Sequence, residues 1–271
     1  MNRKDIATII CNQLENNFET LQVQYQTLNT NIKYFYMDDL LPLLFVKKIA
    51  TIFPNQEEMI LKKSLKEYKY ITAQMDNHDA ILEEILFAFQ DDRVVRLIQK
   101  ICGIEHHIES DPNLYAGGLS LMKKDQFLNP HLDNSHDAER KRWRALNLLF
   151  YVTPNWELKN GGNLELWPNG VQGKSIEILS KFNRLVVMET HDASWHSVNK
   201  VMANQERKCV SNYYFSSVPL PKHNEFHITY FTGRPQEKFK KIWLKFDGQL
   251  RMAIRKIFKK GIVKNPHIYK K

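Results

Sequence analysis

The feature of this sequence that most constrains its fold is a block of short apolar segments in its second half. The segments are rich in Val, Leu, Phe and Tyr, and they are separated by Gly, Pro, Asn and Asp. Many short strands in one block are typical of a β-sandwich or a β-barrel. The predicted strands lie near residues 114–122, 127–133, 144–153, 162–167, 175–178, 183–190, 194–199, 207–216 and 226–231.

Segments with helical periodicity flank this block. Apolar residues at spacings of three and four predict a helix over 3–28. The tract that starts at Tyr34 predicts a short strand, a turn at Asp38 and Asp39, and a helix that ends near Ile52. Further helices are predicted at 56–67, 78–90, 92–102 and 236–260. Helices before and after a β block indicate an α+β protein.

The simplest organisation is one domain over residues 1–271, because no repeat, low-complexity tract or linker interrupts the chain. We expect a mainly helical N-terminal part over 1–110 and a β core over 111–232. A basic C-terminal helix and tail would occupy 233–271.

Composition favours a soluble protein of a reducing compartment. Apolar residues make up 43% and charged residues 25% of the 271, which is ordinary for a globular chain. No run of 18 apolar residues predicts a transmembrane helix, and the N-terminus lacks the pattern of a secretory signal. Cys11, Cys102 and Cys209 are odd in number and scattered, so we expect no disulfide framework and a cytoplasmic location.

The net charge of +9 is concentrated at the C-terminus. Residues 236–271 contain 12 Lys and Arg against 2 acids, whereas the rest of the chain has 27 basic and 28 acidic residues. We expect the apolar stripe of the C-terminal helix to pack on the domain, with its Lys and Arg in solvent. The alternative is contact with an anionic membrane surface, with Trp243 and Phe246 inserted.

Chemistry is indicated first by the stretch FLNPHLDNSHD at 127–137. On a strand, His131 and Asp133 point to the same face, while Leu132 turns away. A surface turn is the other interpretation, because Asn, Ser and Asp usually form turns. Partners farther along the chain decide between the two.

The segment ETHDASWHSVNKV supplies two candidate partners, His191 and His196. Two His and one carboxylate with open positions form the facial triad of a non-haem Fe(II) site. His196, in a short segment of its own, is the first candidate to complete the triad with His131 and Asp133. His191 is the rival ligand, and is otherwise expected to be a solvated residue of a turn.

A candidate anion-binding residue follows in NQERKCVSNYYF. If Arg207 points inward, strand alternation places Ser211 on the same face, and a guanidinium can grip a carboxylate with two hydrogen bonds. Lys208 is the alternative anchor, and only one of the two can face inward. Tyr151, on another predicted strand, could add a hydroxyl.

The ordered segments of residues 114–216 resemble the Fe(II)- and 2-oxoglutarate-dependent oxygenases, and within them the prolyl 4-hydroxylase-like branch. In chain order, the matching segments are HLD, LNLLFYVTPNWELKNGGNLELWPNG, FNRLVVMET, WHSV and ERKCVSNYYF. One departure is that Leu121 and Met122 stand where relatives often have a Tyr, about ten residues before the first metal His.

The resemblance implies a double-stranded β-helix (jelly-roll) core with flanking N-terminal helices and a C-terminal helix. It implies that His131, Asp133 and His196 bind Fe(II). It further implies that Arg207 holds 2-oxoglutarate, with help from Tyr151 and with Ser211 as a further contact. The cofactors would be Fe(II), 2-oxoglutarate and O2, with ascorbate as an optional addition.

The implied enzyme is a dioxygenase that hydroxylates an unactivated C–H bond and releases succinate and CO2. Related halogenases have Gly or Ala in place of Asp133, so the carboxylate favours hydroxylation. The substrate would be a prolyl or other protein side chain, a small molecule, a sugar or a lipid. One alternative is a nucleic-acid dealkylase, although Tyr213 stands where such enzymes carry a second Arg. Another is a non-enzymatic membrane- or partner-binding module.

Overall fold

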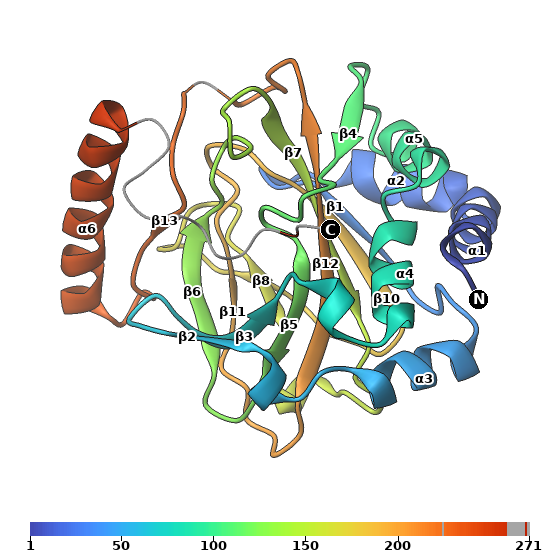
Figure 1. Ribbon diagram of the computed structural model, residues 1–271. Coiled ribbons are helices and arrows are strands. Elements are labelled where there is room, and N and C mark those ends of the chain that lie inside the picture. The colour runs from blue at the N-terminus through green and yellow to red at the C-terminus, as the bar shows by residue number, and fades with distance from the viewer. Residues whose placement is uncertain (224, 259–268, 270–271) are drawn as a thin grey trace.

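A curled antiparallel sheet forms the centre of the protein, with helices on two of its sides (Figure 1). The computed structural model describes residues 1–223, 225–258 and 269. The strands are β1 (Tyr34–Met37), β2 (Ile60–Lys63), β3 (Glu67–Thr72), β4 (Ile108–Ser110), β5 (Gly118–Met122), β6 (Phe127–Leu132), β7 (Trp143–Tyr151), β8 (Leu164–Leu166), β9 (Ile176–Ile178), β10 (Arg184–Glu189), β11 (His196–Val198), β12 (Arg207–Ser216) and β13 (Tyr230–Phe231).

The helices of the N-terminal half lie on one side of the sheet, and the C-terminal helix lies on the other (Figure 1). Their bounds are α1 (Arg3–Asn16), α2 (Phe18–Thr27), α3 (Leu43–Ile52), α4 (Ala80–Ala88), α5 (Asp92–Ile101) and α6 (Lys238–Ile257). Among the described helices, none combines the length and the apolar content needed to cross a membrane.

The strand order divides the sheet into two halves that β3 joins. The order is β1-β10-β7-β12-β5-β3-β6-β11-β8-β9. Strand β3 pairs with β5 through Tyr70 and Leu121, and with β6 through Tyr68 and Phe127. Because the sheet curls, the two halves can line one interior. The predicted α+β fold with a jelly-roll core is confirmed.

Strand β7 separates the hydrophobic core from this interior. Leu146, Leu148 and Phe150 are buried in the same apolar cluster as Ile6 of α1. Since side chains alternate along a strand, Asn147 and the odd-numbered residues that follow it point the other way, into the curl of the sheet. The helical layer therefore fixes which face of β7 is left for a functional site.

The prediction of a helix over 56–67 is wrong. A short 3₁₀ turn covers Gln56–Glu58, and β2 and β3 follow as a hairpin. Periodicity alone is ambiguous in short apolar runs, and the unpaired edges of β5 and β6 are satisfied only by a strand. Strand β4, which pairs with the end of β12, was likewise not predicted from the sequence.

The single helix predicted over 3–28 is two helices that meet at Asn17. The Asn17 side chain donates a hydrogen bond of 2.9 Å to the Gln13 carbonyl in the last turn of α1. Asn commonly ends helices in this way because its side chain competes for backbone groups. The break lets α2 run beside β1 (Figure 1).

The C-terminal helix forms as predicted over its described residues, but its apolar stripe does not pack on the domain. Trp243 is 61% exposed and Phe246 is 60% exposed. The part of the predicted helix and tail at 259–268 and 270–271 lies outside the described residues.

Close pairing of β3 with β5 predicts that Gly118→Ala is strongly destabilising. Gly118 has φ +126°, and a Cβ there would lie 2.3 Å from the Thr72 carbonyl oxygen. Backbone strain and this clash together should lower the free energy of unfolding by about 3 kcal/mol or more. Urea denaturation measures the change.

Gly170→Ala is the matched control. Gly170 also has a positive φ, of +74°, but a Cβ there would meet no atom within 4 Å. We expect a loss of about 1 kcal/mol, from backbone strain alone. Equal losses in the two variants would contradict the close approach of β3 to Gly118.

Candidate metal centre and cavity

Three buried side chains from two paired strands meet in the interior of the sheet. His131 on β6 lies opposite His196 on β11, and Asp133 follows directly after β6. The Asp133 carboxylate oxygens lie 3.6 Å from Nε2 of His131 and 3.6 Å from Nε2 of His196. One candidate ligand atom from each residue can be chosen so that all three lie within 4.8 Å of one another. The predicted group is thus brought together in space.

Backbone carbonyls orient both imidazoles. Nδ1 of His131 lies 3.0 Å from the Asn129 carbonyl, and Nδ1 of His196 lies 3.0 Å from the Ser194 carbonyl. A carbonyl only accepts hydrogen bonds, so each Nδ1 carries the proton and donates. Each Nε2 is then left with a free lone pair that faces the carboxylate, which is the arrangement usual around metal-binding histidines.

Burial sets the charge state of the group. It lowers the pKa of His196 to about 4, and the neighbouring His131 adds to the effect. Burial alone would raise the pKa of Asp133, but Arg144 and the two imidazoles outweigh it and hold that pKa well below its usual range. At neutral pH the site therefore offers a neutral His196 imidazole beside a carboxylate, which suits a divalent cation.

Arg144 is a residue of this site that the sequence did not reveal. Its side chain is buried, and Nη1 lies 3.3 Å from Asp133 Oδ2. The guanidinium stacks 4.3 Å from the centre of the Tyr213 ring. Arg144 thereby compensates the charge of Asp133 and restricts how its carboxylate can rotate.

A β-bulge explains why strand alternation does not predict that Arg144 faces the interior of the sheet. Asn147 opposes Tyr213, but the register shifts by one residue, and Arg144 opposes Phe215. An extra residue in β7 reverses the facing of everything beyond it, so Arg144 joins the interior face. The only signal in the sequence is a charged residue at the head of an otherwise apolar strand.

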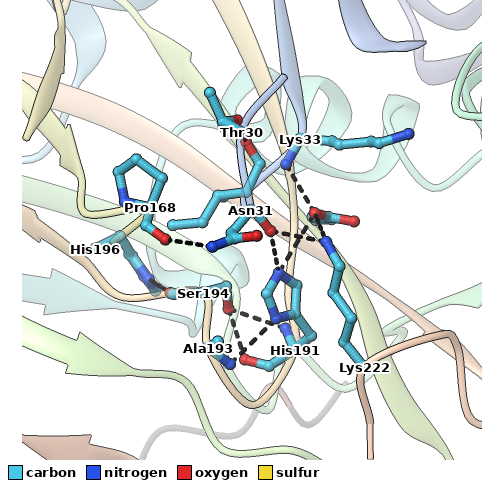
Figure 2. A network of polar contacts seen from close by, with 11 residues as sticks. Thr30, Asn31, Lys33, Pro168, His191, Ala193, Ser194, His196 and Lys222 are labelled. Carbon is cyan, nitrogen blue, oxygen red and sulfur yellow. Dashed lines mark hydrogen bonds and ion pairs between the residues drawn. The ribbon is translucent and has the colours of Figure 1, made fainter. Parts of the chain in front are cut away.

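His191, the rival metal ligand, is neither a ligand nor a solvated turn residue (Figure 2). It is 3% exposed, its Nε2 lies 2.9 Å from the Asn31 carbonyl, and its Nδ1 accepts from the Ala193 N–H at 3.1 Å. Ser194 donates its hydroxyl to the His191 carbonyl, and its own carbonyl accepts from His196. The hydrogen bonds of His191 and Ser194 therefore stabilise the turn that precedes His196.

The triad lines a cavity of about 480 Å³, and Arg207 and Ser211 of β12 line the same cavity. The face of β12 expected from alternation is thus the one the structure shows. Tyr151 is fully buried, and the Arg207 guanidinium lies 4.9 Å from its ring centre. Burial raises the pKa of Tyr151 to about 12, so its hydroxyl keeps its proton.

Arg207 is a buried cation without an ion-pair partner among the described residues. It is 3% exposed, and its Nε donates to Ser180 Oγ at 3.3 Å. Tyr151 Oη lies near Ser180 and Arg207, but it forms no hydrogen bond of good geometry in the described part of the chain. An uncompensated buried charge is costly. A carboxylate placed beside Arg207 would satisfy both groups.

Lys208 points away from the cavity. Its Nζ donates to the Ala50 carbonyl at 3.1 Å and lies 3.6 Å from a Glu206 carboxylate oxygen. On the cavity side, Met122 Sδ lies 3.8 Å from Arg207 Nη1. Of the two candidate anchors, only Arg207 is therefore available to an anion in the cavity.

A jelly roll with two histidines and a carboxylate on its inner face, beside a cavity, is the arrangement typical of mononuclear non-haem iron proteins. Residues 117–215 match the family model described as the 2OG-Fe(II) oxygenase superfamily. The match covers the part of the chain that contains the triad and Arg207. A search of curated protein sequences found no match.

Solved structures of prolyl hydroxylases share the fold. A Pseudomonas putida prolyl-4-hydroxylase has 18% identity and a TM-score of 0.54, over 72% of this chain and 98% of the other. A Trichoplax adhaerens prolyl hydroxylase, in complex with a hypoxia inducible factor peptide, has 18% identity and a TM-score of 0.54, over 75% and 92%. A Phytophthora capsici prolyl 4-hydroxylase has 14% identity and a TM-score of 0.51, over 90% and 75%.

The lowered pKa of His196 predicts a pH dependence of stability in the metal-free protein. Between about pH 6.5 and 4 the unfolded chain binds a proton at His196 and the folded protein does not. Stability is therefore complete above pH 6.5 and declines as the pH falls toward 4. The loss from this residue should be about 3 kcal/mol, measured by urea denaturation in the presence of a chelator.

Two variants isolate the contribution of His196. His196→Gln removes the titrating group, so its stability should fall less steeply between pH 6.5 and 4 than that of the wild type. His107, which is exposed, serves as the control, and His107→Gln should keep the wild-type slope. Equal slopes in all three proteins would show that His196 is not held neutral by burial.

Proposed function

We propose that this protein is an Fe(II)- and 2-oxoglutarate-dependent dioxygenase that hydroxylates an unactivated C–H bond and releases succinate and CO2. The observation that carries the proposal is that two groups suited to bind a ligand line the same cavity. A triad suited to a divalent cation lines it, and so does Arg207, a buried cation that lacks a carboxylate partner among the described residues. A metal ion would bind the triad, and a dicarboxylate would pair with Arg207.

His131, Asp133 and His196 would hold the iron through two Nε2 atoms and one carboxylate oxygen. Three protein ligands on one face leave the remaining coordination positions open. When bound, Fe(II) would supply the redox chemistry that couples oxidation of 2-oxoglutarate to insertion of oxygen into a C–H bond. The protein's part is to keep the lone pairs aimed, through the carbonyls of Asn129 and Ser194.

Arg207 would bind the carboxylate of 2-oxoglutarate that is distal to the metal. Its planar guanidinium group can form two parallel hydrogen bonds to one carboxylate. Tyr151 would donate its hydroxyl to the same group, since its raised pKa keeps it protonated. Ser211 lines the cavity and would be a further contact. Arg144 would hold the Asp133 carboxylate in one orientation as the metal is bound.

The substrate classes that fit are a prolyl or other protein side chain, a small molecule, a sugar or a lipid. Tyr115, Asn134 and Asn147 add polar groups to the cavity wall, so a substrate with hydroxyl or amide groups is favoured. The peptide held by the Trichoplax structure motivates the inclusion of protein side chains. A cytoplasmic location stays a prediction.

We also propose that residues 1–271 act as one oxygenase domain. Helices α1, α4 and α5 share one apolar cluster with β7 and β12, which supports this. Removal of the N-terminal helices would expose the outer face of the strands that carry Arg207 and Arg144.

Alanine at each triad position should abolish turnover. His131→Ala, Asp133→Ala and His196→Ala each remove one of three ligands, and we expect iron-dependent succinate formation to fall to background. The assay would offer 2-oxoglutarate with a panel of prolyl peptides, amino acids, sugars and lipids. Circular dichroism confirms that each variant is folded, and His107→Ala is the surface control. Succinate formation that persists in all three variants would refute the assignment.

Replacement of Arg207 should weaken 2-oxoglutarate binding and leave the metal site intact. Loss of a paired, charge-assisted contact of about 3 kcal/mol should raise the KM for 2-oxoglutarate about 100-fold in Arg207→Ala. Titration calorimetry with Mn²⁺ should give wild-type metal affinity. Lys208→Ala is the matched control and should change neither value. A normal KM in Arg207→Ala, or a raised one in Lys208→Ala, would move the anchor elsewhere.

A further inference from the structure

Helix α6 carries a continuous apolar stripe that faces solvent. At 100° per residue, its members fall within an arc of about 100° on the helix surface. Each is between 52% and 90% exposed. The stripe consists of Phe239, Ile242, Trp243, Phe246, Leu250 and Ile257.

The opposite face of α6 fixes this orientation. Gly248 lies against the Tyr230 ring so closely that a Cβ there would be 2.3 Å from a ring carbon. Arg251 donates to the Thr229 carbonyl at 3.0 Å, and Asp247 forms an ion pair of 2.7 Å with Lys66. Figure 1 shows α6 on the side of the sheet away from α1–α5. The body of the protein therefore holds the stripe outward.

Positive charge borders the stripe. Residues 238–257 contain seven Lys and Arg and one acid. By the same helical periodicity, the exposed Lys238, Lys245 and Lys256 follow one edge of the stripe. Aliphatic and aromatic side chains beside lysines, with Trp243 among them, are the composition of helices that lie in a membrane interface.

We propose that α6 binds the surface of an anionic lipid membrane, with the stripe inserted among the lipids and the lysines at the headgroups. Anionic lipid is complementary to both features at once, since it accepts apolar side chains and neutralises lysine. A second copy of the chain packed through the same stripe would instead bring like-charged helices together, which is unfavourable.

Membrane binding would also position the cavity. Arg251 and Thr229 line the cavity on the side of α6 that is away from the stripe. The cavity thus lies about one helix diameter, roughly 10 Å, from the lipid surface. The protein would then meet substrates that are held at a membrane. This inference goes beyond the proposed function, because lipid binding requires neither iron nor 2-oxoglutarate.

Co-sedimentation with vesicles tests the proposal. The chain of residues 1–271, in chelator, is mixed with vesicles of phosphatidylcholine alone or with 30% phosphatidylserine at about 0.1 M salt. We expect at least tenfold stronger binding to the anionic vesicles, weakened by added salt. Trp243→Ser combined with Phe246→Ser should lower this binding at least tenfold. A variant in which Gln replaces Lys238, Lys245 and Lys256 should lose the preference for phosphatidylserine.

The matched control removes two exposed apolar residues elsewhere. Leu44 is 80% exposed and Leu158 is 53% exposed, so Leu44→Ser with Leu158→Ser should bind vesicles as the wild type does. Absence of binding to anionic vesicles would overturn the proposal. So would a dimer, detected by sedimentation velocity, that becomes a monomer in the Trp243 and Phe246 double variant. Succinate assays on the same variants keep this result separate from the catalytic proposal.

Discussion

The pairing of β6 with β11 is the interaction on which the site depends. It places His131 directly opposite His196 and leaves Asp133 at the end of β6, within 3.6 Å of both imidazoles. Side chains alternate with a period of two, so a slip of one residue would turn one imidazole to the other face of the sheet. Such a slip would also disturb the packing of Val198 and Leu128, which belong to one apolar cluster with Met122 and Trp156.

Charge compensation explains how the interior tolerates so many ionisable groups. Asp133 is paired with Arg144, so this buried carboxylate is stable before any metal binds. Arg207 has no such partner among the described residues, and the protein bears that cost within the fold. Buried unpaired charges are rare in proteins and cluster where a ligand completes them. The asymmetry between the two arginines thus distinguishes a charge that is paired within the protein from one that is available to an anion in the cavity.

The protein also separates its chemistry from its surface charge. Outside the last 36 residues the chain is almost neutral, with 27 basic and 28 acidic residues, and this part carries the triad and Arg207. The excess positive charge lies on α6 and the tail. Arg251 connects the two regions, because it belongs to α6 and lines the cavity. The proposed lipid-binding surface therefore lies beside the cavity, and Arg251 belongs to both.

The sequence by itself determined that short strands form a β core, and that His131 shares a strand face with Asp133 and Arg207 with Ser211, because strand alternation is local. The jelly roll, the meeting of His196 with that pair and the choice of Arg207 over Lys208 were implied by the family resemblance of the ordered motifs. Only the tertiary structure decided that Arg144 faces inward, that β3 joins the halves of the sheet, that His191 is buried in a turn, and that the α6 stripe faces solvent. A bulge, an edge pairing and an outward helix face each depend on contacts with distant parts of the chain, and no local pattern encodes them.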